Sequence, residues 1–75
     1  MQDFLNEYTD TVNQVRAISR FSYCHRNRIP AAEMKLIEVL INNMRNCMEA
    51  NLLSDARRHA SYAKNIIDRV FHTSN

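Results

Sequence analysis

Hydrophobic side chains recur at every third or fourth residue in the first third of the chain. The recurring positions are Leu5, Tyr8, Val12, Val15 and Ile18. An α-helix completes a turn in about 3.6 residues, so this spacing places the apolar side chains on one face of a helix. The pattern predicts a helix over residues 3–26.

A break follows this helix, close to the one proline of the chain. Asn27 favours turns, and the residue before Pro30 is biased away from helical backbone. Pro30 itself suits the first turn of a new helix, because its missing N–H would have no partner there in any case. The apolar repeat then resumes at Met34, Ile37, Ile41, Met44 and Met48. It predicts a second helix over residues 31–50.

A third apolar repeat predicts a helix over residues 54–72. It is carried by Ala56, Ala60, Ala63, Ile67 and Val70. The small alanine side chains allow a neighbouring backbone to approach closely. Ser54 comes just before the repeat and is a favoured N-cap residue, because its hydroxyl accepts a hydrogen bond from a free backbone N–H of the first turn.

Three helices without any strand-like alternation make the chain an all-α protein with a single domain over residues 1–75. One arrangement is a small up-down-up three-helix domain. The other is a helical hairpin plus a third helix that assembles as a dimer. A chain of 75 residues builds only a small core, so support from oligomerisation is expected. The sequence permits both arrangements.

The second helix has more apolar side chains than one stripe requires. Two other helices of so short a chain cannot readily cover them all, and a contiguous exposed apolar surface usually marks an interaction site. We therefore expect this helix to contact another protein or a second copy of the chain, most simply in a homodimer. The residues expected to bind the partner are Leu36, Val39, Leu40, Met44 and Met48.

Four arginines cluster around the expected end of the first helix, in a stretch with no acidic residue. They are Arg16, Arg20, Arg26 and Arg28. Phe21 and Tyr23 lie among them, and basic side chains mixed with aromatic ones can bind a nucleic-acid backbone and stack on bases. A simpler explanation is the helix dipole, which favours acids at the start of a helix and bases at its end. Anion or nucleic-acid binding by these arginines is the second hypothesis.

The composition argues against catalysis. The chain contains no glycine, which disfavours the loops that hold nucleotide phosphates against the backbone. Cys24 and Cys47 lack the close pairing of zinc ligands, and Cys47 lies in an apolar stripe, where burial makes a thiol inert. We expect no enzymatic activity, no cofactor, no metal and no small-molecule substrate.

The distribution of polar residues indicates a soluble, cytoplasmic protein with no membrane partner. No apolar run approaches the roughly 20 residues that cross a bilayer. The first residues include acids, where a secretory signal carries positive charge. The sequence thus predicts a non-catalytic helical adaptor or regulatory protein that binds a partner protein or itself through an apolar helix face. The alternative is a nucleic-acid-associated regulator that uses the basic half of the first helix.

Overall fold

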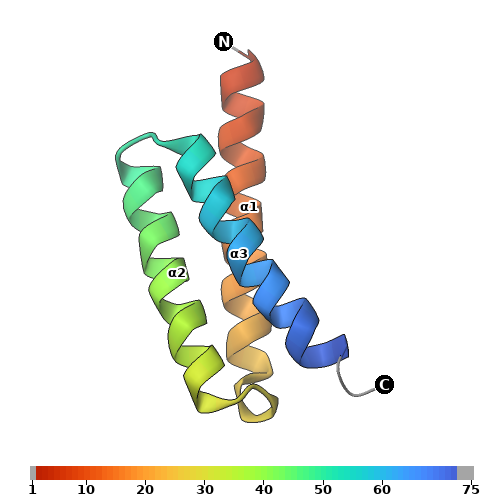
Figure 1. Cartoon of the computed structure of the whole chain (residues 1–75). Helices are drawn as coiled ribbons and strands as arrows, with labels where there is room; N and C mark the ends of the chain where they lie inside the picture. The colour runs from red at the N-terminus through yellow and green to blue at the C-terminus, as the bar shows by residue number, and fades with distance from the viewer. Residues whose placement is uncertain (1, 73–75) are drawn as a thin grey trace.

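The computed structural model describes residues 2–72, with side chains from residue 4 onward, and within this range the protein is a three-helix domain without strands. The helices are α1 (Gln2–Cys24), α2 (Ala31–Glu49) and α3 (Leu53–His72), and a short 3-10 helix, η1 (Arg26–Arg28), precedes α2. Figure 1 shows α2 running back along α1, and α3 crossing in front of α1. The all-α, three-helix prediction is therefore confirmed.

The first helix ends earlier than the apolar spacing predicts. It stops at Cys24, and the chain turns through η1, with the N–H of Arg28 donating to the carbonyl of His25 over 2.9 Å. The turn ends in extended backbone at Ile29, which is buried. Pro30 is the N-cap of α2 rather than its first helical residue, because its carbonyl accepts the N–H of Met34 while its own backbone is extended.

The connection from α2 to α3 uses an asparagine where many helices use a glycine. Asn51 has a φ of 61°. Its N–H donates to the carbonyl of Met48 over 3.1 Å, and the N–H of Leu52 donates to the carbonyl of Cys47 over 2.8 Å. These two hydrogen bonds form a Schellman motif, which satisfies the last carbonyls of a helix.

The N-cap of α3 differs from the one that the sequence suggests. The helix begins at Leu53, and the carbonyl of Leu52 accepts the N–H of Ala56 over 3.0 Å. Ser54 therefore lies inside the first turn and is exposed, so the prediction that it caps the helix is wrong. The Schellman turn sets this boundary, because Leu52 ends one motif and starts the next helix.

The core lies where α2 and α3 pack together, which is the most extensive contact between the described helices. Ala60 and Ala63 of α3 are completely buried, as are Ile37 and Met44 of α2. The small alanines bring the two backbones near each other, as their spacing predicts. Helix α1 adds Val15 and Ile18 to this core but packs less closely on its neighbours.

The N-terminal part of α1 extends beyond the bundle. Figure 1 shows it rising past the α2–α3 connection, and every residue from 4 to 10 is exposed. The first buried residue of α1 that the structure describes is Thr11. About two turns of amphipathic helix are therefore left with one apolar side uncovered by the chain itself.

Candidate partner-binding groove

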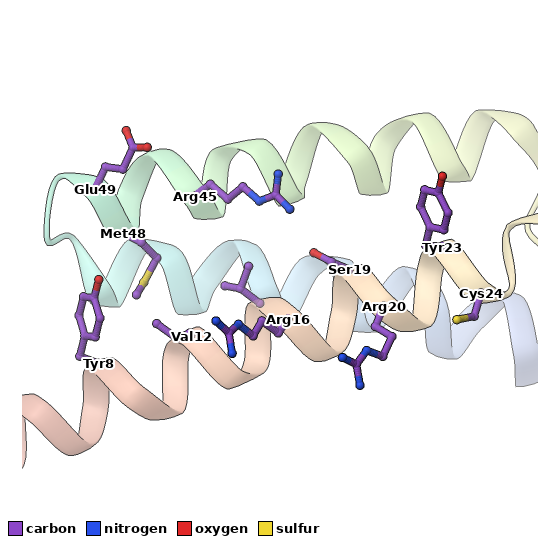
Figure 2. Close-up of a pocket in the computed structure, with 11 residues that line it drawn as sticks. Tyr8, Val12, Arg16, Ser19, Arg20, Tyr23, Cys24, Arg45, Met48 and Glu49 are labelled. Carbon is purple, nitrogen blue, oxygen red and sulfur yellow. The ribbon is translucent and has the colours of Figure 1, made fainter.

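A long open hollow separates α1 from α2, and we call it the α1–α2 groove. Its volume is about 780 Å³. It is lined by Tyr8, Val12, Val15, Arg16, Ser19, Arg20, Tyr23 and Cys24 of α1 and by Arg45, Met48 and Glu49 of α2. Figure 2 shows Val12, Met48 and Tyr23 in the space between the two helices, with Arg20 on the outer side of α1 and Glu49 on the outer side of α2. The groove exists because α3 fills the other side of the α1–α2 pair.

The bottom of the groove is apolar. Val15 is buried, and Val12 and Met48 are half-buried. In Figure 2 the side chain of Met48 descends from α2 toward Val12 on α1. A flexible thioether beside branched aliphatic groups makes a surface that adapts to an incoming apolar side chain. This floor is suited to an apolar stripe of a partner.

The two edges of the groove carry positive charge. Arg16 and Arg20 stand on α1 and Arg45 stands on α2, and all three side chains are exposed. Among the described residues that line the groove, Glu49 is the sole acid. An occupant therefore meets guanidinium groups on either side, which favours an acidic partner.

Tyrosines stand near both ends of the groove. Tyr8 lies toward the N-terminus of α1, and Tyr23 lies one residue before the C-terminal end of the helix. Figure 2 shows Tyr23 reaching toward α2. Tyrosine offers a large apolar surface with a polar tip, and it is enriched at protein interfaces for that reason.

The four arginines that cluster in the sequence do not share one surface. Arg16 and Arg20 line the groove. The guanidinium of Arg26 lies 5.1 Å from the centre of the Tyr23 ring, and that of Arg28 lies 5.4 Å from the centre of the Phe71 ring. These two arginines belong to η1, and the last turn of α1 holds no basic residue. The dipole of α1 therefore does not explain the positions of Arg26 and Arg28, because both residues lie beyond the end of that helix.

The five apolar residues expected to bind a partner have three different environments. Leu36 and Val39 are exposed at 48% and 50%. Leu40 is 8% exposed and Met44 is fully buried in the core, so neither is accessible to a partner in this structure. Met48 is in the groove. The prediction that these five residues form one continuous contact face on α2 is therefore wrong, because α3 covers Leu40 and Met44.

Several groove residues were not recognised as a site in the sequence. The apolar spacing places Tyr8, Val12 and Val15 on one face of a helix, and nothing in the sequence indicates that Arg45 lies across a groove from them. A usable signal was present. Tyr8, Val12, Ser19 and Tyr23 repeat at intervals of about one or two turns beside the buried positions, which predicts a second lining face on the same helix.

The remaining chemistry of the described residues is sparse. Cys24 is exposed and Cys47 is half-buried, and both are free thiols. Within residues 4–72 no cluster of three or more histidine, cysteine or acidic side chains is arranged to hold a metal ion. In the part of the chain that the structure describes, none of the helices has the length and apolarity to cross a membrane.

Comparisons of the chain with protein-family models, with curated proteins and with solved structures give no match.

Proposed function

We propose that the protein is a non-catalytic adaptor or regulator that binds a helical segment of a protein in the α1–α2 groove. The observation that carries this proposal is an apolar floor between two edges that bear arginines. Floor and edges have the composition of a protein interface, which places apolar groups at the centre and polar groups around them.

A helix is the shape that fits such a groove. The two walls are themselves helices that run side by side, and a third helix packed between them continues the ridge-and-groove packing of the bundle. Amphipathic helices bind hydrophobic grooves in this manner, with apolar residues one turn apart as anchors. Val12, Val15 and Met48 provide the complementary surface.

The test is affinity purification from the cells of origin with the wild-type chain and two matched variants. Arg16→Glu together with Arg20→Glu reverses the charge of the α1 edge at exposed positions. Leu36→Asp changes a position that is also exposed, on the part of α2 that does not line the groove. We expect the groove variant to lose a stoichiometric protein that the wild type and the Leu36 variant retain.

Equal retention of that protein by all three chains would contradict the proposal. Loss only with Leu36→Asp would move the binding site to the Leu36 and Val39 side of α2. Circular dichroism of each variant shows that the helices are intact, which separates loss of binding from loss of folding.

A second candidate function is binding of nucleic acid. It is favoured by the presence of Arg16, Arg20 and Arg45 in the same groove as Tyr8 and Tyr23. It is disfavoured by Arg26 and Arg28, which do not line the groove and whose guanidinium groups lie over aromatic rings of the chain itself. A gel-shift titration with labelled RNA and DNA at low salt tests it. A shift that weakens steeply with added salt and disappears in the Arg16 and Arg20 variant would support it.

A further inference from the structure

The N-terminal part of α1 has the chemistry that the α1–α2 groove requires of its occupant. Phe4, Leu5 and Tyr8 are exposed, and the Phe4 and Tyr8 rings lie 6.4 Å apart, on one side of the helix. The same segment carries the exposed acids Glu7 and Asp10. It is an amphipathic, acidic helix that reaches out of the bundle (Figure 1).

Charge divides α1 into two opposite halves. The first 15 residues of the chain contain three acids and no lysine or arginine. From residue 16 to the end of α1 at Cys24 there are two arginines, Arg16 and Arg20, and no acid. Arg45 of α2 adds a further positive charge beside this second half, on the other edge of the groove. The acidic half therefore complements the basic groove, but within one molecule the two belong to the same straight helix and cannot meet.

We propose that the groove of each molecule receives the N-terminal segment of α1 from a second copy of the chain, in a reciprocal two-fold dimer. This inference rests on the proposed function and names its partner. An antiparallel pair of α1 helices brings the acidic half of each against the basic half of the other, and a two-fold axis makes both contacts equivalent. Both edges of the groove carry arginines, so acidic side chains on either side of the incoming helix would lie near a positive charge.

A register follows from the positions of the lining residues. With the two-fold axis at Val12, Tyr8 of one copy meets Arg16 of the other, and Leu5 meets Ser19. The tyrosine ring then lies against a guanidinium, an arrangement that cation–π attraction favours. Leu5, which is 61% exposed in one molecule, enters the groove and is covered.

Charge-reversed pairs test the inference by sedimentation equilibrium. One variant carries Arg16→Glu and Arg20→Glu, and the other carries Glu7→Lys and Asp10→Lys, all at exposed positions. We expect the wild type to be a dimer. Each variant alone juxtaposes like charges, so its dissociation constant should rise by about 100-fold. An equimolar mixture of the two variants restores both contacts and should sediment as a heterodimer.

Leu36→Asp with Val39→Asp is the matched control, because these exposed residues lie outside the groove. This variant should remain dimeric. Its dissociation to monomers would overturn the inference in favour of a dimer through α2. Two reversed variants that stay monomeric after mixing would overturn it as well.

A wild-type chain that is monomeric at concentrations on the order of 100 µM would also overturn the inference. The proposed function would stand in that case if the purification recovers a different protein that depends on Arg16 and Arg20. If these arginines are required only for the binding of labelled RNA or DNA, the proposed function is contradicted as well. The two failures are therefore distinguishable.

Discussion

The Nε of Arg57 donates a hydrogen bond to the hydroxyl of Thr11 over 3.3 Å and so links the first turns of α3 to the middle of α1. The same hydroxyl donates to the carbonyl of Glu7 over 2.6 Å. Thr11 is completely buried, and it marks the level at which α1 enters the bundle.

Replacement of Thr11 by valine should lower the free energy of unfolding by about 0.5–1.5 kcal/mol. Valine keeps the shape and the branched β-carbon but removes both hydrogen bonds of the hydroxyl. Urea unfolding followed by circular dichroism measures the change. Thr9→Val is the control, because Thr9 is exposed on the same helix. An equal effect at both positions would show that the hydrogen bonds contribute nothing.

Ser22→Ala should raise the free energy of unfolding by about 1 kcal/mol. Ser22 is fully buried, and its hydroxyl has no hydrogen-bond partner within the described chain. Burial of this hydroxyl costs hydration that no hydrogen bond offsets, and alanine removes that cost. Ser61→Ala, at an exposed position of α3, measures the gain due to helix propensity alone. Thermal unfolding of the two variants should show a larger increase at Ser22. A smaller increase there would contradict the explanation.

Two substitutions of Asn51 should change stability in opposite directions. Asn51→Gly removes the steric cost of a positive φ and should stabilise the fold by a few tenths of a kcal/mol to about 1 kcal/mol. Asn51→Val places a branched side chain in the same left-handed backbone and should destabilise it by about 1–2 kcal/mol. Urea denaturation tests both. A neutral valine variant would mean that the turn rearranges at little cost.

Leu40→Asp should unfold the protein, whereas Leu36→Asp should not. Leu40 belongs to the core, and a buried carboxylate without a partner adds the cost of desolvation to the loss of apolar contact, at least about 3 kcal/mol together. Leu36 is half exposed, and its carboxylate would remain hydrated. The helical signal at 222 nm distinguishes them. A folded Leu40 variant would return that residue to the set of possible partner contacts.

The periodic spacing of apolar residues was sufficient to predict three helices, their order and much of the core. Ile37, Ala60 and Ala63 are buried as their stripes predict, because helical periodicity determines which side chains share a face. The exposure of Arg16 and Arg20 also follows from positions that avoid the core stripe of α1.

The tertiary structure alone decided where those faces lie relative to one another. Leu36 and Leu40 are four residues apart on the same helix, yet one is exposed and the other buried, because α3 covers only part of the broad stripe of α2. Arg26 and Arg28 do not lie beside Arg16 and Arg20, because the chain turns through η1. This turn brings Arg28 onto Phe71, more than 40 residues away in the sequence. The spacing within a helix gives the direction of each side chain about its own axis, whereas the packing of three helices determines which directions are filled and which remain open as the α1–α2 groove.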